Sequence, residues 1–318
     1  MSARKTPISP FNGDALAEAA RRILRGELVA VPTETVYGLA ADATNPEAVA
    51  RIYAAKGRPS FNPLIVHVRS LVQAEWIAYF NSDALALARA FWPGPLTLVL
   101  PRRATSGLAP AVSAGLPTVA LRMPKHHIVQ ALLTLAERPL AAPSANRSGS
   151  ISPTTATHVA ESLGEDAPMI LDGGPTERGV ESTIVAVGPQ GARLLRPGPI
   201  SVEQLRDAGM SLALSGGSGI EAPGMMASHY APSKLVRLDA IEAATDEWLI
   251  GFGPVEGDES LSAKGDLAEA AANFFAALHR AEAAPPARIA VAPIPDTGLG
   301  AAINDRLRRA AAPRPETT

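Results

Sequence analysis

The chain has 318 residues, of which 47% are hydrophobic and 19% charged, a balance that allows one large or two ordinary domains and excludes disorder of the whole chain. It has no cysteine, which excludes a disulfide framework, a thiolate nucleophile and a cysteine-bound metal cluster. Its net charge is −2, with 20 Lys and Arg against 17 Asp and Glu in residues 1–220 and 9 against 14 in residues 221–318, so neither part is typical of a polyanion-binding surface.

Helical and strand patterns alternate through the first 200 residues. We expect helices at about 13–25, 46–56, 70–91, 125–137 and 154–163. We expect strands at 27–33, 64–68, 96–101, 118–123, 140–145, 169–173, 182–187 and 192–197. Because the last three strands follow one another without helices between them, the sheet should be mixed and not purely parallel.

A glycine- and serine-rich run, SGGSGIEAPG at 215–224, predicts a flexible connection to a second domain. Beyond it we expect three strands, each followed by a helix, which is typical of a small parallel sheet of Rossmann-like type. These strands are at 234–238, 247–253 and 288–294, and the last two helices are at about 266–280 and 299–310. We therefore divide the chain into a first domain at 1–212, a linker at 213–232 and a C-terminal domain at 233–318.

Several functional classes are disfavoured by missing patterns. The start of the chain has no apolar segment typical of a signal peptide, and no stretch approaches the about 18 apolar residues of a membrane span, so we expect a cytoplasmic protein without membrane contact. There is no HExxH motif, and the phosphate-binding pattern GxxxxGK[ST] is absent, which excludes a P-loop NTPase. Aromatic residues make up only 4% of the chain, which argues against strong direct nucleic-acid binding.

Polar groups follow the first expected strand in VPTETVYGLAADA at 31–43, which places Thr33, Glu34 and Thr35 at the strand end. Open α/β sheets bind ligands at such ends. The threonine hydroxyls could therefore hold a small polar ligand, or they could only cap a turn.

Two cations flank a glycine in AAKGRPSFNPLIVHV at 54–68. Lys56 and Arg58 in a loop shaped by Gly and Pro suit a polyphosphate, although a solvated charged turn would look the same. Asn62 then precedes a strand that carries His67, and a lone strand histidine is more often a structural residue.

A second set of polar residues lies in the later strands and loops. Thr118 and Arg122 share one face of the strand in PTVALRMP, and Arg122 between two apolar residues needs an anion, which a ligand or a structural carboxylate would supply. The loop APSANRSGSISPTT at 142–155 offers short donors for phosphate or ribose, although generic polar loops look similar. The candidates in this loop and in the strands after it are Ser144, Asn146, Ser152, Ser182 and Arg196.

Together these segments resemble the YrdC-like threonylcarbamoyl-AMP synthase family in its long, two-domain form. PTETVYGL, KGRP, NPL with HV, PSAN, GVESTIV and LRPG occur in the order of that family across about residues 15–200. PGMMASHYAP at 223–232 and VAPIPDTGLGAAINDRLRRAA at 291–311 resemble the long form specifically. The resemblance implies an α/β fold, in which a twisted mixed sheet with helices surrounds a positively lined cavity and a smaller Rossmann-like domain follows.

The resemblance also implies a reaction and a set of residue roles. The amine of L-threonine would capture bicarbonate as a carbamate, whose carboxylate attacks the α-phosphate of ATP and expels pyrophosphate, while Mg²⁺ arrives with ATP and needs no metal site of the protein. L-threonine would be bound by Thr35, His67, Arg122, Ala142 and Ser182. ATP would be bound by Arg58, Asn62, Thr118, Ser144, Asn146, Ser152, Arg196 and Tyr230. Lys56 and Arg58 would be catalytic by offsetting phosphate charge, and Tyr230 would belong to a movable cover.

The family implies a downstream partner, a transferase complex that moves the threonylcarbamoyl group to tRNA. Two other functions remain open from the sequence. One is an RNA-binding module, which the near-neutral charge disfavours. The other is a carbamoyl-transfer domain of the hydrogenase-maturation type, whose proteins carry cysteine-rich zinc segments that this chain lacks.

Overall fold

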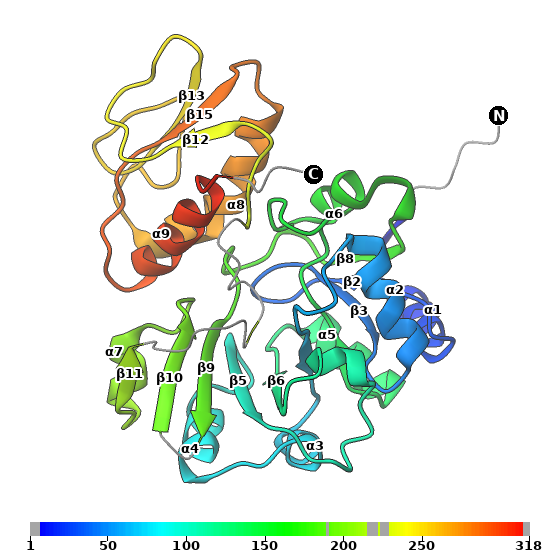
Figure 1. The fold of residues 1–318 in the computed structure, drawn as a ribbon. Coiled ribbons are helices and arrows are strands. Elements are labelled where there is room, and N and C mark those ends of the chain that lie inside the picture. The colour runs from blue at the N-terminus through cyan, green and yellow to red at the C-terminus, as the bar shows by residue number, and fades with distance from the viewer. Residues whose placement is uncertain (1–6, 189–190, 215–221, 223–228, 314–318) are drawn as a thin grey trace, which may run out of the picture.

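The computed structural model describes residues 7–188, 191–214, 222 and 229–313. Within them the chain forms an eleven-stranded sheet and a separate four-stranded sheet (Figure 1). The strands of the large sheet are β1 (Ile8–Pro10), β2 (Val29–Val31), β3 (Gly38–Asp42), β4 (Ile65–His67), β5 (Leu96–Pro101), β6 (Thr118–Arg122), β7 (Leu140–Ala141), β8 (Met169–Asp172), β9 (Thr183–Gly188), β10 (Gly191–Arg196) and β11 (Leu212–Leu214).

The large sheet is mixed, as the sequence predicts. Its order is β1-β8-β2-β3-β7-β4-β6-β5-β9-β10-β11. Strands β4 and β6 run parallel, whereas β5 and β6, and β9 and β10, are antiparallel. The short strands β1 and β3 were not predicted. Strand β3 has the sequence GLAAD, which lacks the β-branched residues that favour strands. It forms because it pairs with β2 and β7.

Helices cover both faces of this sheet. They are α1 (Gly13–Leu24), α2 (Pro46–Lys56), α3 (Leu71–Ile77), α4 (Ser82–Phe91), α5 (His127–Ala136), α6 (Ala156–Leu163) and α7 (Val202–Asp207), with short 3-10 turns at Pro110–Ser113 and Gly164–Asp166. Alternate strand residues point to opposite faces. Val29 and Val31 of β2 pack in one core with α1 and α5, while Ala30 packs in the other core with α2, α3, α4 and α6.

The C-terminal domain has a small parallel sheet, as predicted. Its order is β12-β15-β13-β14, and its elements are β12 (Leu235–Arg237), β13 (Glu247–Gly251), β14 (Glu259–Ser260), β15 (Arg288–Val291), α8 (Leu267–Ala283) and α9 (Leu299–Ala310). The helix predicted between the first two strands is wrong, since residues 238–246, all of them described, form turns. Arg237 donates to the carbonyl of Glu242 at 2.9 Å and pairs with Glu247 at 2.6 Å, which closes this connection tightly.

One hydrophobic cluster contains residues of both domains. Helices α8 and α9 lie between the small sheet and the first domain (Figure 1). Val180 of the first domain packs in the same cluster as Phe274 and Phe275 of α8. The rings of His158 and His279 stack across this contact with 3.8 Å between their centroids. The C-terminal domain is therefore packed closely against the first domain.

The predicted linker at 213–232 is described only in part. Strand β11 includes its first two residues, and residues 215–221 and 223–228 lie outside the described residues. The division into domains at 212 and 233 stays a prediction. Among the described residues, no helix has both the length and the apolar character required to cross a membrane.

A glycine substitution tests the domain contact. Gly179 has φ +66°, and a Cβ there would lie 2.2 Å from the carbonyl oxygen of Ala271 in α8, whereas Gly174, with φ +79°, has open space around it. We expect Gly174→Ala to lower the free energy of unfolding by about 1–2 kcal/mol through its backbone conformation alone. Gly179→Ala should cost roughly 1–3 kcal/mol more, because the domains must move apart. Urea unfolding of both variants checks this, and equal losses would contradict the close contact.

Candidate active site

A cavity lies over the face of the large sheet that carries the ends of β4, β6 and β9. Predicted site residues from both the threonine set and the ATP set line it, namely Thr35, Arg58, His67, Arg122, Ala142, Ser144, Ser182, Arg196 and Tyr230. Its volume is about 50 Å³, below the roughly 300–1,000 Å³ of ordinary ligand pockets. As described, the cavity is too small to hold a nucleotide.

Strand register brings the first pair of site residues together. Strands β4 and β6 are parallel neighbours, and His67 is the register partner of Arg122. Thr35 reaches them from the turn between β2 and β3, where the Arg122 guanidinium donates through Nη1 to the Thr35 hydroxyl at 2.8 Å. Three segments far apart in sequence thus meet at one point of the cavity.

Arg122 has a carboxylate partner that sequence analysis did not assign. Its Nη2 lies 2.7 Å from Oε1 of Glu34, and both side chains are buried. The contact is an ion pair. Burial is the largest single influence and raises the pKa of Glu34, but the charge of Arg122 and the nearby donors of Arg122, Glu34 and Lys125 together outweigh burial, so the net shift is downward. The structural carboxylate that the sequence left open therefore exists, beside Thr35 in the same motif.

His67 is buried, and neither ring nitrogen has a hydrogen-bond partner within the described part of the chain. Burial, assisted by the charge of Arg122, lowers the pKa of His67 to about 3, so the ring is neutral at physiological pH. Buried polar atoms are normally paired, and a structural histidine would have a partner. The ring nitrogens lack a well-formed partner in the described residues, and the choice between a structural and a ligand-binding role of His67 stays a prediction.

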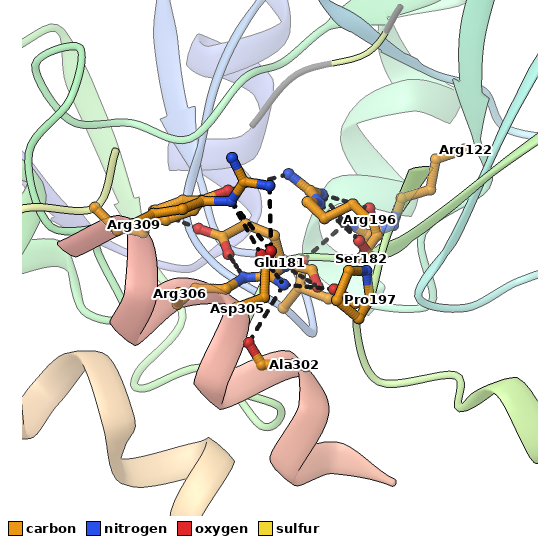
Figure 2. A network of polar contacts seen from close by, with 12 residues as sticks. Arg122, Glu181, Ser182, Arg196, Pro197, Ala302, Asp305, Arg306 and Arg309 are labelled. Carbon is orange, nitrogen blue, oxygen red and sulfur yellow. Dashed lines mark hydrogen bonds and ion pairs between the residues drawn. The ribbon is translucent and has the colours of Figure 1, made fainter. Parts of the chain in front are cut away.

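Two more guanidinium groups line the cavity. Arg58 donates to Oδ1 of Asn62 at 2.6 Å and to the carbonyl of Pro63 at 2.8 Å, and burial lowers its pKa to about 10, so it remains charged. Arg196 donates to the carbonyl and the hydroxyl of Ser182 at 2.9 and 3.1 Å (Figure 2). Asn62 itself is buried and orients Arg58 from behind the cavity wall formed by the described residues.

Lys56 lies behind the wall of the cavity that the described residues form. Its ammonium group is buried and donates to the carbonyls of Ser144, at 2.7 Å, and of Asn146. Burial and the nearby charge of Arg58 lower its pKa well below the usual value. Lys56 thus ties the end of α2 to the loop that carries Ser144, and its action on phosphate charge stays a prediction.

The other predicted ATP residues also stand back from the cavity lining of the described residues. Asn146 donates to the carbonyls of Arg147 and Ser150, so it shapes its own loop. Ser152 is buried, and its hydroxyl bonds to a carboxylate oxygen of Glu181. Thr118 begins β6 opposite Pro101. Their contacts with ATP remain predictions.

His229 and Tyr230 close the cavity from the described end of the linker. Tyr230 is buried with φ +63°, and its hydroxyl lies 3.4 Å from Nη1 of Arg196. Its ring packs on Phe275 of α8 with 5.7 Å between centroids. The Nδ1 atom of His229 is buried and has no hydrogen-bond partner among the described residues. We call this pair the cover, and its movement stays a prediction.

The buried neutral state of His67 gives a pH prediction. Unfolding exposes the ring, whose pKa then returns to about 6.5. Between pH 7 and pH 5 the His67 ring becomes protonated in the unfolded form but stays neutral in the folded form. This difference should lower the free energy of unfolding by about 2 kcal/mol. His67→Asn should therefore lose about 2 kcal/mol less than the wild type over this range in urea titrations. Identical pH curves for wild type and His67→Asn would contradict the burial of a neutral ring.

Two family models match consecutive parts of the chain, and two named relatives match most of it. A family model described as "Telomere recombination" (Sua5/YciO/YrdC) matches residues 21–198, and one described as "Threonylcarbamoyl-AMP synthase, C-terminal domain" matches residues 200–312. The threonylcarbamoyl-AMP synthase of Pyrococcus abyssi is 42% identical over 317 residues, covering 92% of each chain. That of Bacillus subtilis is 39% identical over 328 residues, covering 95% of this chain and 94% of its own.

A solved structure extends the likeness to three dimensions. The crystal structure of P. abyssi Sua5 complexed with L-threonine matches with a TM-score of 0.87 and 39% identity, over 96% of each chain. The family expected from the motifs is confirmed over both domains. The chain therefore belongs to the Sua5/YciO/YrdC family of threonylcarbamoyl-AMP synthases, as a long-form member that carries the additional C-terminal domain.

Proposed function

We propose that the chain joins L-threonine, bicarbonate and the AMP part of ATP into threonylcarbamoyl-AMP, with release of pyrophosphate. The observation that carries this proposal is that residues of the predicted threonine set and of the predicted ATP set line one cavity. Relatives that cover nearly the whole chain bear the name of this synthase. The likeness to a structure complexed with L-threonine supports threonine as the amino acid.

The threonine end of the cavity is built around Arg122 and His67. A guanidinium binds a carboxylate in a bidentate manner, so Arg122 would hold the carboxylate of threonine, with Glu34 fixing its orientation from the other side. The unpaired nitrogens of His67 and the hydroxyls of Thr35 and Ser182 would pair with the polar groups of the amino acid. The amine would then remain available to form a carbamate, either with bicarbonate and loss of water, or with the CO₂ derived from bicarbonate and loss of a proton.

The ATP end contains Arg58 and Arg196. One carboxylate oxygen of the carbamate forms a bond to the α-phosphorus, and the bond from that phosphorus to the pyrophosphate oxygen breaks. No protein nucleophile is needed, so the enzyme acts by positioning the reactants and by stabilising charge. The two buried guanidinium groups act strongly because little water screens them, and Mg²⁺ enters as part of the ATP substrate. Within the described residues, no cluster of three or more His, Asp or Glu side chains is placed to hold a metal ion.

Neither alternative function has an observation in its favour. The buried cations face a small cavity, and the chain as a whole is nearly neutral, so the features expected of an RNA-binding surface are weak. The sequence lacks the cysteine-rich zinc segments of the hydrogenase-maturation alternative, whereas the relatives named as the synthase cover 92% and 95% of this chain. The proposed product would pass to a complex that transfers the threonylcarbamoyl group to tRNA, a reaction that we place in the cytoplasm.

The reaction is tested by incubating the protein with ATP, threonine and labelled bicarbonate. We expect a labelled AMP adduct and one pyrophosphate per adduct, both dependent on threonine. Arg58→Gln should lower the rate of adduct formation by about 30- to 1,000-fold, because removing one charged contact from a dry site costs on the order of 2–4 kcal/mol. Arg89→Gln, which alters an exposed arginine of α4, is the control and should keep the wild-type rate. Pyrophosphate release without threonine would refute the proposed substrate.

A further inference from the structure

A fully buried arginine of the C-terminal domain contacts a residue that lines the cavity. Arg306 lies in α9 with 0% exposure, and its Nε is 3.1 Å from Oε2 of Glu181, which lines the cavity (Figure 2). The other carboxylate oxygen of Glu181 accepts from the hydroxyl of Ser152. Both oxygens of this buried carboxylate are thus engaged, one by each domain.

The same guanidinium joins two segments of the site. Nη2 of Arg306 donates to the main-chain carbonyl of Glu181 at 3.3 Å, and Nη1 donates to the carbonyl of Pro197. Glu181 directly precedes Ser182, and Pro197 directly follows Arg196. Arg306 therefore holds the start of β9 and the end of β10 at a fixed separation. It also lies over the ring of Tyr230, 5.6 Å from its centroid, and so contacts the cover.

The charges around the cavity show why this contact matters for an anion. Arg58, Arg122 and Arg196 line the cavity together with the carboxylate of Glu181. Glu34 already balances Arg122, so two cations remain to face the phosphates. Without Arg306, the negative charge of Glu181 would cancel about one of these two positive charges, because little water screens charges in this site.

We propose that Arg306 is a positioning residue for ATP, which neutralises Glu181 and fixes the two segments that carry Ser182 and Arg196. Arg306 acts through these groups and does not touch the substrate itself. The C-terminal domain is then part of the electrostatic construction of the active site. This inference rests on the proposed function, since it assigns the cations of the cavity to ATP.

The test compares Arg306→Gln, Glu181→Gln and the double variant, with Arg308→Gln as the matched control. Arg308 is in the same helix, is 61% exposed and pairs only loosely, at 3.9 Å, with Asp296. The readouts are the KM values for ATP and threonine, kcat, and the affinity for α,β-methylene-ATP measured by calorimetry. Circular dichroism and thermal unfolding report whether each variant is folded.

Arg306→Gln should raise the KM for ATP and weaken binding of the analogue by about tenfold, with a smaller change in the KM for threonine. Removal of the carboxylate in the double variant should restore ATP binding to within about threefold of the wild type, because the unbalanced negative charge is gone. A purely structural role would leave the double variant at least as impaired as Arg306→Gln, and that result would overturn the proposal. Normal ATP binding in Arg306→Gln would overturn it as well.

If Arg306→Gln does not fold, Glu181→Gln alone tests the proposal. It removes one negative charge from the cavity lining and leaves Arg306 in place with its other partner, Asp305, at 3.2 Å, so binding of the analogue should tighten by about threefold, and weaker binding would contradict the proposal. Failure of the proposed function is distinguishable, because wild type and Arg308→Gln would then form no threonine-dependent adduct. Calorimetry of the charge variants would still show whether Arg306 and Glu181 affect binding of the ATP analogue.

Discussion

The burial of positive charge is the constraint on which the rest of this structure depends. A cation removed from water must be paired or hydrogen-bonded, or the fold loses several kcal/mol. Each buried cation here has such partners, which are main-chain carbonyls for Lys56, an amide and a carbonyl for Arg58, and carboxylates for Arg122 and Arg306. The loops around the cavity are shaped by these contacts.

These partners divide the cations into two groups. Arg58, Arg122 and Arg196 keep a surface on the cavity while their remaining donors are held by the protein. Lys56 and Arg306 are enclosed and stabilise the segments that carry the first group. A site for a highly charged ligand thus needs more cations than those that touch the ligand.

The packing of the C-terminal domain also brings a buried cation to its partner. Its two helices bury apolar residues against the first domain, and Gly179 allows the backbones to approach closely. This contact places Arg306 beside Glu181, and it lets the ring of Tyr230 pack against Phe275. The cover therefore lies between the domain contact and the cavity.

The sequence by itself determined the family, the mixed sheet, the parallel C-terminal sheet and most of the cavity residues, because these follow from local periodicity and from motifs such as PTETVYGL and KGRP. It could not determine partners that are distant along the chain. The pairing of Arg122 with Glu34, the turn of Lys56 away from the cavity and the pairing of Arg306 with Glu181 depend on strand register and domain packing. Only the tertiary structure decided them, since a buried charge takes whichever partner the fold brings within reach.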